Sequence, residues 1–412
     1  MRGRIPGVMA TGLVTVLLLF SVVAGAEKVN LLLLVQDNRI DALSKFFDPE
    51  PSIDYTPVVT FIGGLPDSEL LKLIRLYFPR NYKEFSKYNA LLLAKPQYYL
   101  FTDKQDRWIH DSIYDGAGGI NDGSTFSQVP GIPESWASGI AWQAFPNDAP
   151  AVVANYAAWA PIVAYNVQVN GDHPEPILTI FLPFGVEKPI YSGVSRVVLP
   201  RQGSSVLAWQ LGNYPIRQPL LTSWEYGAGR AMTIGNLIPN GWIGYPSRET
   251  GQNPYSAEIL INMLYWLTDT GLIDDVEVFH RVKYYFTEFN WRFKDLISLS
   301  EFIDRFGANT DRIYEKIGGI IGDYDGAAEL YLEHDFLESE VQIRSLLDRF
   351  AEVEEIARRE KDRALAWVYL IEWLVSASVF FVSGFTLWTL MIRRKLYRAV
   401  EITRLAGSSK KA

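Results

Sequence analysis

The sequence predicts an α/β domain with a doubly wound, mostly parallel sheet, followed by a helical region and one transmembrane helix. Three observations lead to this prediction. Short apolar runs alternate with helical patterns in the first part of the chain, a heptad stripe follows, and a charge-free apolar stretch lies near the C-terminus. Alternating strands and helices are typical of a parallel sheet with helices on both faces.

The first part of the chain supplies the parallel strands. Strands are expected at Val29–Val35, Val58–Ile62 and Asn89–Ala94, because each is a short apolar run that ends in polar residues or glycine. A helix is expected to begin after Pro66, with acidic residues in its first turn. Another begins at Thr102–Asp103, and Gly116 to Gly119 are expected to end it.

A β-rich insertion is expected between about residues 130 and 230, where proline and glycine separate short β-prone runs. These runs are Ala160–Val169, Ile177–Leu182 and Ser205–Trp209. A hairpin is predicted from Leu220–Tyr226 and Arg230–Ile234, which flank a glycine-containing turn. An amphipathic helix at Ala257–Thr268 then closes a domain that spans residues 27–272.

Residues 273–363 are predicted to be helical. Phe336, Ile343, Phe350 and Ala357 recur every seven residues, and Leu346 and Val353 lie three residues after two of them. This heptad stripe over 331–361 has two interpretations that stay open, a short coiled-coil stalk or an ordinary helix packed on its neighbour. The first would allow self-association or contact with another membrane protein.

Both ends of the chain carry membrane-targeting patterns. Residues 1–26 resemble a signal peptide, with Arg2 and Arg4 before an apolar stretch and Ala24-Gly25-Ala26 as the cleavage site. Within the predicted transmembrane helix, 364–392, the 20 residues Trp373–Ile392 are uncharged, which is long enough to cross the hydrocarbon layer. The tail 393–412 is basic and should stay in the cytoplasm, leaving the N-terminal domain extracytoplasmic at the cell surface.

Composition excludes several classes of function. With no cysteine among 412 residues, the chain has no disulfide framework, thiol nucleophile or Cys-ligated metal site. No histidine pair has metal-ligand spacing, so neither a metal nor a cofactor is expected. The net charge is −8 although the C-terminal tail is basic, so the outer domain is acidic and nucleic acid is not an expected partner.

Several phrases resemble the C-terminal half of class I glutamine amidotransferase-like domains. They are Ser205–Trp209, the run Pro219–Met232 with Trp224-Glu225-Tyr226-Gly227-Ala228-Gly229-Arg230, Trp242, and Ile261–Leu267. The stretch from Thr102 to Gly119 is similar to the helix and glycine turn that precede the nucleophile strand in active members. The resemblance covers about residues 28–270 and implies a flavodoxin-like, amidotransferase-like sheet.

The chain departs from this family where catalysis would occur. Active members use a Cys–His–Glu triad, whereas the corresponding region here is Gly119–Thr125 and contains no cysteine. The catalytic candidates are Ser124 and Asp122, and a serine needs a nearby base. Of the histidines His110, His173, His280 and His334, none is an evident base, and His173 is expected to be structural. Asp115, Asp122 and Asp172 could form an acid–base pair or a cation site, but loop aspartates are more typical of turns and helix caps.

Ligands of open α/β sheets bind at the carboxyl ends of the strands, which here would bring together Gln36, Asp37, Asn121 and Asp122. Tryptophans in the β-rich part, Trp136, Trp142, Trp159, Trp209, Trp224 and Trp242, are interpreted as core rather than sugar-binding residues. Two hypotheses follow. The favoured one is a non-catalytic domain that binds a protein or ligand, or serves in assembly. The alternative is an extracytoplasmic hydrolase or carbohydrate-active enzyme with a site near Asp122 and Ser124.

Overall fold

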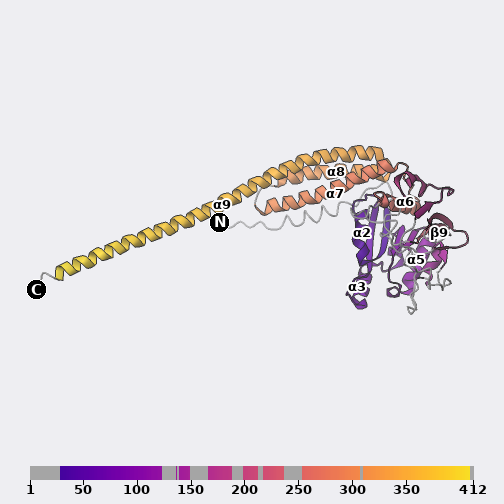
Figure 1. Ribbon diagram of the computed structural model, residues 1–412, viewed down its shortest axis with the longest axis horizontal. Helices are drawn as coiled ribbons and strands as arrows, with labels where there is room; N and C mark the ends of the chain where they lie inside the picture. The colour runs from indigo at the N-terminus through magenta and orange to yellow at the C-terminus, as the bar shows by residue number, and fades with distance from the viewer. Residues whose placement is uncertain are drawn as a thin grey trace. The chain divides into compact units, whose positions relative to one another are not determined.

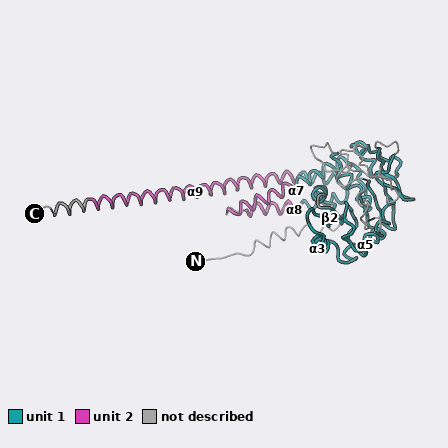
Figure 2. The backbone as a smooth tube through the Cα atoms, turned by 60° about the horizontal axis from the view of Figure 1, so that its bottom comes forward, with its two compact units in different colours: residues 1–290, 323–345 teal, residues 291–322, 346–412 magenta. Residues whose placement is uncertain are grey.

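The computed structural model describes residues 28–122, 136, 139–148, 166–187, 198–211, 217–235, 253–306 and 310–408 (Figure 1). The predicted signal peptide, 1–26, and Ser124 therefore lie outside the described residues. The chain divides into two compact units, residues 1–290 with 323–345, and residues 291–322 with 346–412 (Figure 2).

The first unit is built on one large mixed sheet. Within the described residues this sheet has eight strands in the order β2-β1-β3-β4-β10-β9-β8-β6. The five strands β2, β1, β3, β4 and β10 are parallel to one another. The sheet continues from β10 through β9, β8 and β6, and each of these three strands is antiparallel to the strand before it. The bounds are β1 Val29–Gln36, β2 Ile53–Phe61, β3 Ala90–Ala94, β4 Gly118–Asp122, β6 Asn166–Val169, β8 Ser205–Leu211, β9 Gln218–Tyr226 and β10 Gly229–Ile234. A two-stranded sheet pairs β5 Asn147–Asp148 with β7 Leu199–Pro200. The predicted mostly parallel α/β sheet is confirmed at this level, and β6, β8 and β9, which the sequence assigns to a β-rich insertion, are strands of the same sheet.

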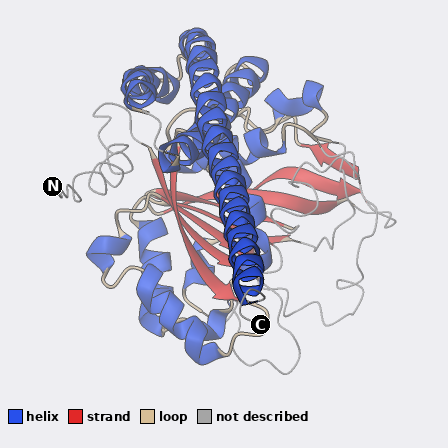
Figure 3. Ribbon diagram, turned by 90° about the vertical axis from the view of Figure 1, so that its left-hand side faces the viewer, coloured by secondary structure: helices blue, strands red, loops and turns tan. Residues whose placement is uncertain are grey.

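Helices lie on both sides of the sheet (Figure 3). They are α2 Asp37–Phe47, α3 Asp67–Tyr77, α4 Tyr82–Phe85, α5 Asp103–Tyr114 and α6 Ser256–Thr268. Two glycines of β4 show how closely two of these helices approach. A Cβ atom on Gly118 would meet Leu267 of α6 at 2.6 Å, and one on Gly119 would meet Ile113 of α5 at 2.6 Å. Because successive strand residues point to opposite faces, α5 and α6 cover opposite faces of β4.

Burial explains why the first apolar run is a central strand. Residues Leu31 to Val35 of β1 are fully buried, and β1 lies between β2 and β3. Leu32 and Leu34 pack in one apolar cluster with Ile109 and Ile113 of α5. A strand covered on both faces has no polar alternation, which is why this run is continuously apolar.

The ends of α5 follow the predicted chemistry in part. Thr102 is its N-cap and forms a capping box with Gln105. The glycine stretch was expected to end the helix, but only Gly116, at φ +127°, lies in the turn. Gly118 and Gly119 belong to β4. That part of the prediction is wrong, because these glycines admit the helices on either side rather than reverse the chain.

The expected strand at Ile177–Leu182 is also wrong. Thr179–Phe184 forms the 3₁₀ helix η6, which ends at Gly185 with φ +75°. Ile177 and Leu178 are buried all the same. A short apolar run does not distinguish a strand from a buried helical turn.

Three long helices follow the α/β body, namely α7 Val276–Arg305, α8 Asp311–Leu332 and α9 Phe336–Ser408. Every apolar position of the predicted heptad stripe, from Phe336 to Ala357, is buried. The helix begins at Phe336 rather than near Tyr331. Its segment Phe336–Arg398 contains an 18-residue window of mean hydropathy 1.9, and none of that window is buried. By length and composition α9 can cross a membrane.

Candidate functional site

The carboxyl ends of β1 and β4 are joined by a buried ion pair between Arg39 and Asp122. Arg39 lies in the first turns of α2, directly after β1, and Asp122 is the last residue of β4. The Arg39 guanidinium donates to the Asp122 carboxylate, and the two side chains are 3% and 0% exposed. Parallel strands end at the same edge of a sheet, so the fold brings these two residues together.

This pairing determines what Asp122 can do chemically. A carboxylate that is held by a guanidinium and has no solvent exposure is poorly placed to take a proton from a substrate. Asp122 remains near the predicted edge but acts as one half of an ion pair. Sequence reasoning missed Arg39. The only feature of the sequence that could have indicated Arg39 is its position, shortly after the polar residues at the end of β1.

The other predicted ligand residues are distributed along this edge. Gln36 is the last residue of β1 and is 7% exposed, and Asp37 is the first residue of α2. Asn121 pairs in register with Leu93 of β3 and Thr233 of β10. Asn121 is fully buried, and within the described residues neither atom of its amide has a hydrogen-bond partner.

The remaining carboxylates and histidines have structural contacts. Asp115 follows α5 and accepts a hydrogen bond from the Tyr82 hydroxyl at 2.6 Å. His110 contacts the Tyr226 hydroxyl through Nε2 at 2.9 Å. His173 Nδ1 lies 3.1 Å from the Glu175 carbonyl oxygen, in the turn expected from the sequence. Within the described chain no group of three or more His, Asp or Glu residues is arranged to hold a metal ion.

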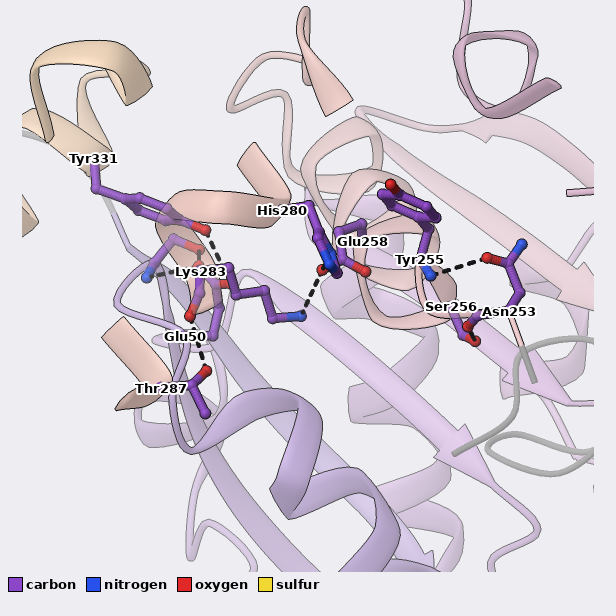
Figure 4. A network of polar contacts seen from close by, with 10 residues as sticks. Glu50, Asn253, Tyr255, Ser256, Glu258, His280, Lys283, Thr287 and Tyr331 are labelled. Carbon is purple, nitrogen blue, oxygen red and sulfur yellow. Dashed lines mark hydrogen bonds and ion pairs between the residues drawn. The ribbon is translucent and has the colours of Figure 1, made fainter. Parts of the chain in front are cut away.

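A second buried polar cluster lies away from this edge, around Glu50 (Figure 4). The Ser52 hydroxyl donates to Glu50 Oε1 at 2.6 Å, and the Tyr331 hydroxyl donates to Glu50 Oε2 at 3.0 Å. The Tyr265 hydroxyl in turn donates to Ser52 Oγ at 2.7 Å. Burial raises the pKa of Glu50 above its usual value, against the opposing charge of Lys283 and these hydrogen bonds.

Next to Glu50, Lys283 and His280 of α7 approach Glu258 of α6. His280 Nδ1 lies 2.9 Å and Lys283 Nζ 3.7 Å from Glu258 Oε1. Burial acts to raise the pKa of Glu258, but Lys283 and His280 together outweigh it and lower that pKa. In the part of the chain that the structure describes, Lys283 Nζ and Glu258 Oε2 have no hydrogen-bond partner. The 3.7 Å separation is a charge contact rather than a hydrogen bond.

These residues have the chemistry of an acid–base site, yet their side chains are enclosed. Glu50, Glu258 and Lys283 are each at most 6% exposed. They come from a loop, α6 and α7, and Tyr331 adds α8, so the cluster connects the helices to the α/β body within the first unit. No sequence motif marks them, because they lie far apart along the chain.

A surface groove of about 510 Å³ lies elsewhere, and Asn30, Asp54, Arg80, Glu84 and Lys87 are among its lining residues. Asn30 and Asp54 are near the starts of β1 and β2, so the groove is at the amino ends of the strands. Its lining carries both signs of charge.

The tryptophans that the sequence places in the β-rich part contribute to packing where the structure describes them. Trp136 and Trp142 are 3% and 4% exposed, and Trp224 Nε1 donates to the Ala144 carbonyl at 2.9 Å. Trp159 and Trp242 lie outside the described residues. Trp136, Trp142 and Trp224 therefore contribute to packing, as expected for core residues.

Comparison with known proteins gives structural similarities alone. The sequence matches no protein-family profile and no curated protein. Two cytoplasmic proteins from Salmonella typhimurium are similar in structure. One, from strain LT2, has 15% identity and a TM-score of 0.42 over 58% of this chain and 99% of its own; the other has 13% and 0.39 over 58% and 98%. A protein described as ThuA-like, from Bacteroides uniformis, has 14% identity and a TM-score of 0.31 over 60% of this chain and 94% of its own. At such identities none of them transfers an activity to this chain.

Proposed function

We propose that the chain is a single-pass membrane protein whose α/β domain lies outside the cytoplasm and binds a ligand or another membrane protein without catalysing a reaction. The basic residues after the apolar part of α9 favour a cytoplasmic C-terminus, because positively charged flanks are retained there. The signal-peptide pattern at the N-terminus supports the same orientation.

The observation that carries the non-catalytic part of the proposal is the Arg39–Asp122 ion pair. In the resemblance to amidotransferase-like domains, Asp122 lies in the region that holds the nucleophile. Here that position carries a buried carboxylate neutralised by Arg39, and the chain has no cysteine. The adjacent Asn121 is also fully enclosed.

Two exposed apolar residues of α9 favour an assembly role. Leu337 and Val341 are 64% and 63% exposed and lie one helical turn apart, on a helix whose heptad positions are already buried. Side chains spaced by four residues lie on the same face of a helix, so one partner surface would contact both.

The test is purification of the full-length protein from its native membrane in mild detergent, followed by identification of what copurifies. A partner recovered with the wild type should be lost with Leu337→Gln/Val341→Gln and kept with the control Glu338→Gln. Recovery of no membrane protein with the wild type would contradict the assembly role.

The orientation is tested separately on intact cells. Protease added outside should digest residues 27–363 and leave the basic tail protected. The enzyme alternative would be supported if the purified protein hydrolysed ester or glycoside substrates, and if a folded Asp122→Asn variant lost that activity.

A further inference from the structure

Five exposed aromatic side chains of the second unit occur at the end of α7, near the start of α8, and on α9 shortly before its apolar run, which itself begins with the exposed Trp373. They are Phe302, Phe306, Tyr314, Trp367 and Tyr369, called the aromatic collar below, and each is at least 37% exposed. Single exposed aromatic residues also occur elsewhere on α7, such as Tyr284 and Trp291 at 60% and 66% exposed, but a group of exposed rings indicates a surface that contacts something other than water.

Three collar residues lie where α7 ends and α8 begins. The rings of Phe302 and Phe306 contact each other, with centroids 4.7 Å apart. Between them in sequence, Ile303 is fully buried, as is nearly all of Ile313 at the start of α8. Buried residues such as Ile303 and Ile313 therefore already fill the core where α7 ends and α8 begins, and the exposed rings lie outside that core.

The other two collar residues follow the point at which α9 leaves its neighbours. In both views the parts of α7 and α8 in the second unit lie beside α9 (Figures 1 and 2). Ala364 is 3% exposed, and no described side chain of α9 beyond it is buried. Ala364 thus marks the level at which the cover ends. Trp367 and Tyr369 follow within about 8 Å at about 1.5 Å per residue.

We propose that the aromatic collar lies in the lipid headgroup layer of the membrane that α9 crosses, so that the α7–α8 end makes a second contact with the bilayer. This inference rests on the proposed anchoring by α9. Aromatic rings with a polar edge prefer the membrane–water interface, and the apolar run begins a few residues beyond the collar.

The charges around the collar indicate the kind of lipid surface. Acidic and basic residues alternate at the helical end: Glu301, Asp304, Arg305, Asp311, Arg312, Glu315 and Lys316. A mixed set of this kind has no strong attraction for an anionic surface, which selects clusters of lysine and arginine. The collar therefore fits a zwitterionic headgroup layer, and rings rather than charges supply the contact.

The absence of cysteine makes this proposal directly testable, because each introduced cysteine is the only thiol. The full-length Phe306→Cys variant would carry an environment-sensitive nitrobenzoxadiazole label and be reconstituted in phosphatidylcholine vesicles. Headgroup-attached nitroxide lipids should quench this label several-fold more than a label on Glu352→Cys, an exposed position about 18 Å before Ala364 on α9. A label on Phe380→Cys, within the apolar run, reports anchoring through nitroxides placed deep in the acyl chains.

The outcomes separate the two proposals. Quenching at position 380 with none at 306 overturns the collar and leaves the anchor intact. Quenching at neither position overturns both. A label at 306 that responds to protein density but not to nitroxide lipids identifies a second copy as the occupant, which also overturns the lipid contact. Tyr314→Cys repeats the measurement if Phe306→Cys does not give the helical circular dichroism of the wild type.

Discussion

The Tyr331 hydroxyl of α8 donates a hydrogen bond of 3.0 Å to Oε2 of Glu50, which lies in the connection between α2 and β2. Both residues belong to the first unit, and both are almost completely buried. The Ser52 hydroxyl donates a second hydrogen bond to Glu50, and the Tyr265 hydroxyl donates to Ser52. The buried carboxyl group of Glu50 is therefore held by side chains from several elements of the fold.

Replacing Tyr331 with phenylalanine removes one of the donors to Glu50 and leaves the ring in place. We expect the free energy of unfolding of the full-length protein in detergent to fall by about 1–3 kcal/mol, because a buried acceptor loses its partner. Tyr284→Phe is the matched control, since Tyr284 is 60% exposed. Equal stability of the two variants in urea titrations would contradict the role assigned to Tyr331.

The pH dependence of stability should change when Glu50 becomes glutamine. Burial raises the pKa of Glu50 in the folded state, so the neutral form is favoured by folding. The stabilisation is fully present below the ordinary pKa near 4.5 and is lost as pH rises through the raised value. Relative to the wild type, Glu50→Gln should therefore become progressively more stable as pH increases above about 4.5. Parallel stability curves for the two proteins over this range would show that Glu50 titrates normally.

The Arg39–Asp122 pair should behave as a buried unit. Asp122→Leu or Arg39→Met alone removes one half of the ion pair and leaves the other charge buried, and each is expected to lower the free energy of unfolding by about 3–5 kcal/mol. The double variant Arg39→Met/Asp122→Leu should recover most of that loss, because no unpaired charge remains. Chemical denaturation of the four proteins forms a double-mutant cycle. Additive losses in the double variant would mean that the two side chains act independently.

Two buried asparagines provide an internal comparison. Asn121 has no hydrogen-bond partner within the described residues, whereas Asn262 donates to the Ile177 carbonyl at 2.9 Å and accepts from the Ile273 N–H at 2.8 Å. We expect Asn121→Leu to raise the melting temperature and Asn262→Leu to lower it, because only the second loses satisfied bonds. If Asn121→Leu also lowers the melting temperature, the side-chain amide of Asn121 is hydrogen-bonded to a water molecule or a ligand in the protein in solution.

Local patterns in the sequence were sufficient for much of the fold. The run Leu31–Val35, the hairpin around Gly227 and the helix now bounded as Ser256–Thr268 were predicted because their periodicity and turn residues act over a few positions. The apolar length of α9 is likewise a property of consecutive residues. At Ile177–Leu182 the same reasoning failed, since a short apolar run suits either a strand or a helical turn.

The candidate site was only partly accessible from the sequence. The rule that ligands bind at the carboxyl ends of parallel strands directed attention to Asn121 and Asp122, but it did not indicate that Arg39 pairs with Asp122. No pattern pointed to Glu50, Glu258 or Lys283 either.

What the sequence by itself determined are elements that depend on neighbouring residues: the buried run of β1, the β9–β10 hairpin, the N-cap of α5 and the apolar segment of α9. Tertiary structure alone decided which charges are enclosed together. Side chains such as Glu50 and Lys283 come from distant parts of the chain, and an ion pair or hydrogen bond exists only once packing brings both partners within reach and removes the water between them.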